Sequence, residues 1–228
     1  MLELHGYLPF ILEGMGLTVA VAVGSLALSI VLGMFGAAAK LSGSIAAKTV
    51  AGVYTTIIRG VPDLVLMLLI FFGGQIAVNN IGDRLGWDYV DIDPFVAGVI
   101  TIGFIFGAYM TETFRGAILA VPRGEIEAGL AYGMSETQAF LRVTLPQMVR
   151  HALPGFGNNW LVLAKATALV SVIGLHDMVY NAGQAGGTTR QPFTFYFVVA
   201  LLYLAITASS EVLLRWADRR ASVGVRKA

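Results

Sequence analysis

Long apolar blocks dominate this sequence of 228 residues. A helix that crosses a bilayer needs about 20 largely apolar residues, and four blocks are long enough, at residues 10–39, 55–78, 94–120 and 193–215. A fifth block, residues 154–175, is more polar but also long enough. Only 13% of the residues are charged, whereas a soluble domain carries about 25%. We therefore predict an all-α membrane protein, with five transmembrane helices in a single domain over residues 1–228.

Composition also narrows the function classes. The formal net charge is only +1, so no nucleic-acid partner is indicated. The absence of Cys excludes disulfides, thiolate metal sites and a Cys nucleophile. The three histidines show no metal-binding spacing such as His-Glu-x-x-His. The first ten residues contain no Lys or Arg, unlike a cleaved signal peptide, so we expect the first apolar block to be retained.

Basic residues are distributed unevenly between the segments that connect the blocks. With the N-terminus outside, twelve of the 15 Lys and Arg residues lie on the cytoplasmic side. Arg84 and Arg190 remain outside, and Lys165 lies within a span. Because cytoplasmic loops carry an excess of Lys and Arg, we predict an external N-terminus and a cytoplasmic C-terminus. The twelve are Lys40, Lys48, Arg59, Arg115, Arg123, Arg142, Arg150, Arg215, Arg219, Arg220, Arg226 and Lys227.

A charged, helix-prone stretch, residues 123–147, separates the third and fourth blocks. Glu127 to Tyr132 favours a helix, and Gly133 is a natural left-handed terminator. Ser135 and Gln138 have the spacing of a capping box. The second helix is expected to end near Thr144, because Pro146 lacks an N–H and restricts the residue before it. This pattern fits either a helix pair that docks on a soluble partner or a helix that lies on the lipid headgroups.

The same stretch resembles a known element. The sequence EAGLAYG followed by TLPQ resembles the EAA loop of ABC-importer permeases, whose pattern is Glu-Ala-Ala, a Gly four residues later and a downstream Ile-x-Leu-Pro. Gly129 and Val143 depart from that pattern. In the family, this loop forms the coupling helix that sits in a groove of the ATPase subunit. The resemblance implies that Glu127, Ala128, Gly133 and Pro146 are coupling residues.

The resemblance extends along nearly the whole chain, through RGVPDLVLM, FGAYMTETFRGA and GNNWLVLAKATALVS. These segments resemble the polar amino-acid permeases, most of all the Q-type subunit of histidine and lysine/arginine/ornithine importers. The family implies a type I (MetI-like) permease core of five helices in the inner membrane. It also implies a second permease subunit (an M-type chain or a second copy), two ATPase subunits that bind ATP and Mg²⁺, and a periplasmic substrate-binding protein. The implied cargo is a polar, cationic amino acid, moved by alternating access.

Polar side chains within the spans are candidates for the substrate pathway, because an ionisable group in a membrane is costly. Glu112 lies three residues before Arg115, so it either pairs with that Arg or contacts a cationic cargo. Asn158 and Asn159 either hydrogen-bond the substrate or bridge neighbouring helices.

Two further segments carry expectations. The end of the fourth span is expected to form a gate with Thr167, Leu169 and Ser171. Asp63 follows Pro62, which suits the first turn of a helix, so a capping role is expected for Asp63. Asp177 is expected at a surface or an interface.

Other functional classes lack their motifs. No Gly-x-x-x-x-Gly-Lys-Ser/Thr loop is present, so the chain itself is expected to bind no cofactor and to hydrolyse no ATP. No Gly-x-Ser-x-Gly motif or other catalytic motif points to an enzyme. The alternative is a secondary carrier or channel that works without an ATPase, although such carriers usually have repeated halves and none is visible here.

Overall fold

A computed structural model describes residue 4 and residues 6–221, and all the regular elements in that part of the chain are helical. In chain order they are α1 (Leu8–Leu41), α2 (Ile45–Gly60), α3 (Asp63–Leu85), α4 (Pro94–Leu119), α5 (Arg123–Ala131), α6 (Glu136–Ala139), the π-helical turn η1 (Phe140–Thr144), α7 (Leu145–Ala166), the 3₁₀ segment η2 (Thr167–Ile173), α8 (Met178–Thr189) and α9 (Pro192–Ala221). Five continuous helical stretches in this part of the chain are long and apolar enough to cross a membrane: Leu8–Leu41, Asp63–Leu85, Pro94–Leu119, Glu136–Ile173 and Pro192–Ala221. The prediction of five apolar helices is confirmed.

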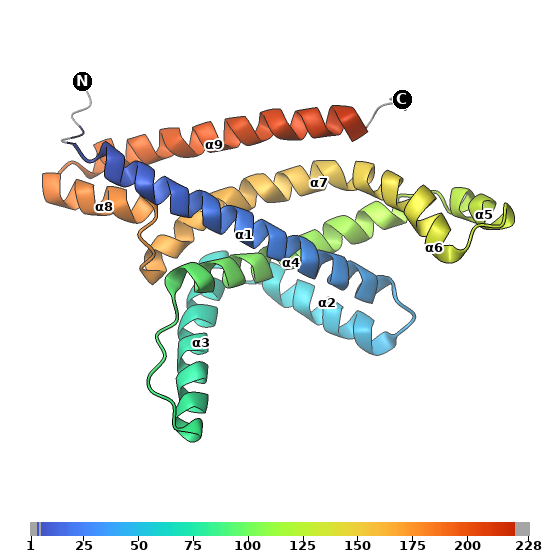
Figure 1. Ribbon diagram of the computed structural model, residues 1–228, viewed down its shortest axis with the longest axis horizontal. Helices are drawn as coiled ribbons and strands as arrows, with labels where there is room; N and C mark the ends of the chain where they lie inside the picture. The colour runs from blue at the N-terminus through green and yellow to red at the C-terminus, as the bar shows by residue number, and fades with distance from the viewer. Residues whose placement is uncertain (1–3, 5, 222–228) are drawn as a thin grey trace.

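Helices α1, α4, α7 and α9 run along the long axis of the molecule (Figure 1). The most extensive packing joins α1 and α4, and small residues allow their backbones to approach closely. A Cβ atom added at Gly36 of α1 would lie 2.2 Å from Thr111 Oγ1 of α4. The main apolar core gathers around α4, where Ile102, Ile105 and Phe106 are almost fully buried.

The second predicted span, residues 55–78, is not a single helix. Helix α2 ends at Gly60, Val61 is extended (φ −112°, ψ 140°), and α3 begins at Asp63. The residue before a proline is sterically excluded from helical geometry, and here Pro62 enforces that break. Asp63 is the acidic residue in the first turn of α3, where it complements the helix dipole, as expected.

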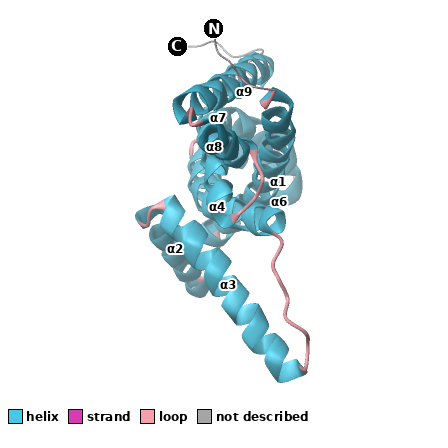
Figure 2. Ribbon diagram, turned by 90° about the vertical axis from the view of Figure 1, so that its left-hand side faces the viewer, coloured by secondary structure: helices cyan, strands magenta, loops and turns pink. Residues whose placement is uncertain are grey.

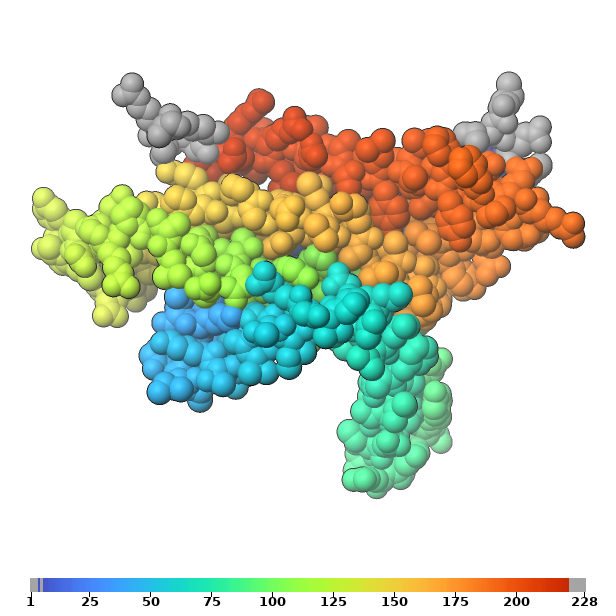
Figure 3. Space-filling view, turned by 180° about the vertical axis from the view of Figure 1, so that it is seen from behind, coloured from blue at the N-terminus to red at the C-terminus, as the bar shows by residue number. Residues whose placement is uncertain are grey.

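Helix α3 projects away from the bundle (Figures 2 and 3) and continues to Leu85, seven residues beyond the predicted end of the span. The segment that follows α3 folds back along it. Gln75 Nε2 donates to Val90 O at 2.5 Å, Ile92 N donates to Gln75 Oε1 at 2.9 Å, and Val90 N donates to Asn79 Oδ1 at 2.8 Å. These side chains satisfy backbone groups in a segment without regular structure, so α3 and its return segment form one unit.

The fourth stretch begins well before its predicted start and ends at Ile173, close to its predicted end. We expected a helix end near Thr144, but the chain continues from α6 through η1 into α7, with Pro146 in the first turn of α7. In the π-helical turn η1, Leu145 N donates to Phe140 O, five residues back. This wider turn accommodates a proline that has no N–H to donate. The apolar stretch therefore begins before residue 154, and Pro154 lies inside α7.

Short helix α8, which the sequence did not predict, lies between η2 and α9 and packs on α1 and α9. Its N-cap is Asp177, whose carboxylate accepts from Tyr180 N at 2.9 Å. Asp177 is fully buried, so a surface position is wrong, and Asp177 lies instead where the start of α8 contacts α1. The cause is tertiary, because α1 closes over this N-terminus and Thr18 Oγ1 accepts from Met178 N.

Candidate functional site

The loop of residues 123–147 is an exposed pair of helices at one end of the bundle (Figure 1). Helix α5 ends at Ala131, and Gly133 adopts the left-handed conformation, with φ of 86°. Ser135 caps α6, and a complete capping box joins Ser135 and Gln138. The predicted helix, left-handed glycine and capping box are therefore confirmed, because each depends on neighbours within a few residues.

The surface of this loop carries both charged and apolar groups. Glu127, Ala128, Gly133 and Pro146 are all exposed. Tyr132 is 90% exposed, an unusual position for an aromatic side chain on a surface that contacts only water. Ile126 is half-buried, and three further apolar side chains of the loop and the adjoining turn are 40–54% exposed: Leu130, Phe140 and Leu141.

The two helices are held to each other and to α7 by close contacts. Gly129 is buried, and a Cβ atom there would lie 3.3 Å from Met134 Sδ. Gln147 Nε2 of α7 donates to Glu125 Oε2 of α5 at 2.5 Å. The loop is therefore a structured element that is joined to α7 by a side-chain hydrogen bond.

A polar cavity of about 460 Å³ lies between α1, α2 and α4. Glu112 is at its centre: Arg115 Nε donates to Glu112 Oε2 at 3.0 Å, and Lys40 Nζ donates to Glu112 Oε1. Lys40 also donates to Thr55 Oγ1 at 2.6 Å. The expected Glu112–Arg115 pair is thus present. Lys40, which we had assigned only to the cytoplasmic charge excess, is a second cation on the same carboxylate.

The wall of this cavity on the α2 side carries a further cation. The Arg59 guanidinium lies 5.5 Å from the centre of the Tyr109 ring, in the range of a cation–π contact. The cavity therefore contains a carboxylate with two partners, a cation on an aromatic face, and the hydroxyl groups of Thr55 and Tyr109. Such a lining can hydrogen-bond a zwitterionic ligand but has no nucleophile with a general base beside it.

The two asparagines of α7 point to different surroundings. Asn159 Nδ2 donates to Thr113 Oγ1 of α4 at 2.9 Å, so this amide bridges two helices. Asn158 instead lines a groove between α7 and α9, apart from the cavity around Glu112.

The three gate candidates all lie in η2, where the α7 helix tightens. Thr167 is buried; its hydroxyl donates to Ala164 O and lies 3.3 Å from the Tyr203 hydroxyl of α9. Ser171 donates to Ala168 O, and Leu169 is half-buried. A 3₁₀ turn is common at the C-terminus of a long helix, and this segment ends at Gly174 with φ of 90°.

In residue 4 and residues 6–221, no group of three His, Asp or Glu side chains is placed to hold a metal ion.

Comparison with known proteins places this arrangement in a family. Residues 29–223 match the family described as binding-protein-dependent transport system inner membrane component. The chain belongs to this family.

The alignments with related permeases cover almost the whole length of this chain. It is 53% identical to the histidine/lysine/arginine/ornithine transport system permease protein HisQ of Salmonella typhimurium, over 99% of each chain. It is 44% identical to the octopine transport system permease protein OccQ of Rhizobium meliloti, over 95% of this chain and 92% of that one. It is 38% identical to the arginine ABC transporter permease protein ArtQ of Escherichia coli, over 91% and 92%.

Solved structures agree with this assignment. A crystal structure of an amino acid ABC transporter with histidines matches with a TM-score of 0.80 and 32% identity, over 94% of this chain and 95% of that one. An inward-facing MetNI methionine ABC transporter matches with a TM-score of 0.65 at 17% identity, which shows a shared fold. The chain is therefore a multi-pass inner-membrane ABC permease with a MetI-like fold, and its relatives are named as transport components.

Proposed function

We propose that this permease is the membrane-spanning subunit of an ATP-driven importer that moves a polar, cationic amino acid into the cytoplasm. The observation that carries the proposal is the 53% identity, over 99% of both chains, to a permease named for histidine, lysine, arginine and ornithine. Relatives named for octopine and arginine also fit a cargo with a cationic side chain.

The proposed orientation has the N-terminus outside and the C-terminus in the cytoplasm. Figure 1 supports it, because the C-terminal end of α1, the α5–α6 pair and the C-terminal end of α9 all lie at one end of the bundle. Lys40, Arg123, Arg142, Arg215 and Arg219 belong to these segments. A single end that is rich in Lys and Arg is expected to face the cytoplasm.

The α5–α6 pair is proposed to receive the force from two partner ATPase subunits, which hold ATP and Mg²⁺. Its exposed Glu127, Ala128 and Gly133, with Pro146 at the start of α7, would form the docking face. The contact between Gln147 and Glu125 supports this role, because it links the docking face to a membrane helix.

A second permease subunit is proposed to cover α3. In the single chain, only 11% of the most apolar part of α3 is buried, whereas 61% of the corresponding part of α4 is buried. An M-type chain or a second copy would complete the pathway between two such bundles, and an external binding protein would deliver the cargo. The core would alternate between inward-open and outward-open states whose populations ATP binding shifts.

Within the permease, the cavity around Glu112 is the proposed substrate pathway, with Asn158 and Asn159 as weaker candidates. Thr167, Leu169 and Ser171 are proposed to gate it. Arg59 on Tyr109 is placed to meet an α-carboxylate. The Glu112 carboxylate would attract the cationic end when its two partners shift.

Reconstitution of the complete transporter in lipid vesicles tests this function. Uptake of labelled arginine or histidine should require ATP on the ATPase side and binding protein on the opposite side, and unlabelled lysine should compete better than glutamate. Uptake by the permease alone, without ATPase and ATP, would instead establish a secondary carrier or channel.

A further inference from the structure

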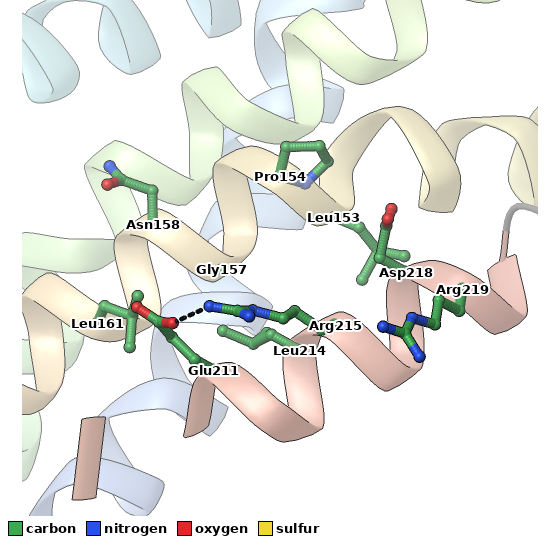
Figure 4. A pocket seen from close by; sticks show the side chains of 10 residues that line it. All are labelled: Leu153, Pro154, Gly157, Asn158, Leu161, Glu211, Leu214, Arg215, Asp218 and Arg219. Carbon is green, nitrogen blue, oxygen red and sulfur yellow. Dashed lines mark hydrogen bonds and ion pairs between the residues drawn. The ribbon is translucent and has the colours of Figure 1, made fainter. Parts of the chain in front are cut away.

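A groove of about 600 Å³ runs between α7 and α9 (Figure 4), and of the site candidates above only Asn158 lines it. Leu153 and Leu161 of α7 and Leu214 of α9 are its apolar lining. The polar lining is Asn158 of α7 and the charged side chains of α9, Glu211, Arg215, Asp218 and Arg219. Leu153 and Leu161 are about 12 Å apart along α7, given a rise of 1.5 Å per residue. The groove is therefore long enough for part of a hydrocarbon chain and ends beside cations.

The groove lining carries two carboxylates, Glu211 and Asp218, and two arginines, Arg215 and Arg219. Arg215 Nη2 pairs with Glu211 Oε2 at 2.6 Å, as the dashed line in Figure 4 shows. Asp218, the other carboxylate on the lining, has an interaction of its own. Arg219 is exposed and forms no ion pair in this part of the chain. Two further arginines lie close by, since Arg150 Nε of α7 donates to Ala221 O at the end of α9 and Arg220 follows Arg219.

An aromatic side chain indicates the depth of these cations. Trp216 of α9 is 57% exposed, and the Arg220 guanidinium lies 4.7 Å from the centre of its ring. Trp is enriched where a membrane helix meets the headgroups. On the N-terminal side of Trp216, α9 exposes Leu204, Val212 and Leu213, as a surface in hydrocarbon would. The apolar part of the groove thus faces the acyl region, and its arginines lie at headgroup level.

We propose that this groove binds an anionic phospholipid of the cytoplasmic leaflet. The phosphodiester would lie against Arg219 and the outer edge of Arg215, and one acyl chain would lie along Leu153, Leu161 and Leu214. Basic pockets between transmembrane helices on the cytoplasmic side are suited to such headgroups. Arg219, which forms no ion pair within the described residues, favours an anionic lipid over a zwitterionic one. The assignment to the cytoplasmic leaflet rests on the proposed orientation of the permease.

Native mass spectrometry of the assembled transporter tests the proposal, with phosphatidylglycerol and phosphatidylethanolamine as probes. Phosphatidylglycerol should bind more tightly, and Arg219→Gln should weaken its binding about fivefold, the effect of one basic residue at an anionic surface. Arg220→Gln is the matched control. It removes the same charge from the next residue, which lies outside the groove lining, so the affinity should stay near that of the unmodified protein. Leu161→Trp, which fills the apolar part of the groove, should weaken both lipids equally.

Three results would overturn the proposal. One is equal binding of the two lipids, which identifies ordinary boundary lipid, and another is an unchanged phosphatidylglycerol affinity in Arg219→Gln. The third is a photo-crosslink from position 161 to the second permease, which makes the groove a protein interface. Labelling of Arg220→Cys by an impermeant maleimide in oriented vesicles reports the side of the membrane separately. Labelling from outside would refute the orientation while leaving the lipid preference measurable.

Discussion

Asp177 is a carboxyl group enclosed by protein, and one of its oxygens, Oδ2, has no hydrogen-bond partner within the described residues. Burial raises the pKa of Asp177 from 3.8 to about 6, although backbone N–H groups, including that of Tyr180, partly oppose the change. Because the folded pKa is above the unfolded one, folding favours the neutral form. The contribution of this carboxyl group to the free energy of unfolding is about 3 kcal/mol. It is fully present below about pH 4 and is lost as the pH rises through about 6.

Asp177→Asn should remove this dependence. The amide keeps an oxygen that can accept from Tyr180 N, since Asn caps helices as well as Asp does, and it cannot ionise. We expect the melting temperature of the unmodified complex to fall between about pH 4 and pH 7 more steeply than that of the variant. Thermal unfolding in detergent over this range is the measurement. Asp88→Asn, at an exposed position, is the control, and an equal effect of the two substitutions would contradict the account.

Glu112 is held by two cations, and this arrangement separates a structural role from a role in transport. Lys40→Met would leave Glu112 and Thr55 without one donor each, at a cost of about 1–3 kcal/mol. Lys48→Met, on exposed α2 surface, should cost little. The double variant Lys40→Met/Glu112→Gln should recover part of the loss, because the partly buried carboxylate is no longer charged and the remaining cation, Arg115, is 38% exposed to solvent.

Melting temperature and yield of the assembled complex measure this effect of the Lys40 substitution. Should Glu112→Gln alone leave assembly and basal ATPase intact while uptake falls, Glu112 acts on the substrate pathway instead.

The packing of α1 on α4 depends on close backbone approach, which makes it sensitive to single methyl groups. Gly36→Ala would place a Cβ atom 2.2 Å from Thr111 Oγ1, and overpacking of this kind costs about 1–3 kcal/mol. Gly16→Ala lies on the same helix, and a Cβ atom there meets nothing within 4 Å. The melting temperature should therefore fall for Gly36→Ala and not for Gly16→Ala. Equal stability of both variants would show that α1 can shift to make room.

The α5–α6 pair depends on one backbone conformation. Gly133→Val would force a β-branched residue to φ of 86°, at a cost of about 1 kcal/mol or more, and would redirect α6. Glu127→Lys reverses a charge on the proposed docking face. Both variants should reach the membrane and pair with the second permease but lose the ATPase in pull-down from detergent extracts. Gly43→Val is the control, because Gly43 lies at the same end of the bundle but does not have a positive φ. A Cβ atom there would meet nothing within 4 Å. This variant should retain the ATPase.

If both α5–α6 variants keep the ATPase and transport normally, the α5–α6 pair is only an interfacial helix element.

At the scale of the whole molecule, α3 is the element that lacks a cover. Its apolar face includes Leu69, Phe72 and Ile76, which are 54–63% exposed. The chain contains no Cys, so a single cysteine reports contacts cleanly. Ile76→Cys should form an oxidative or bifunctional cross-link to the second permease subunit. Leu213→Cys, on the exposed face of α9, should label with lipid-phase reagents and give no such cross-link. Absence of the Ile76 cross-link in an active complex would mean that α3 faces lipid.

Local physics allowed several features to be read from the sequence alone. The apolar blocks predicted the number of apolar helices, because membrane-crossing length and hydropathy belong to one segment at a time. The same holds for Gly133 and for the Ser135–Gln138 capping box, whose partners lie within three residues. The Glu112–Arg115 pair was also predictable, since residues three apart share a helix face.

Only the tertiary structure decided the remaining features, because they join residues that are far apart in the chain. Lys40 reaches Glu112 across 72 residues, and α1 buries Asp177 at a helix start that resembles an exposed turn in sequence. The continuation through Pro146 depended on a π-helical turn that propensity does not specify. Each of these outcomes reflects how α1, α4 and α7 pack, and packing energies depend on three-dimensional neighbours that a linear pattern of residues does not contain.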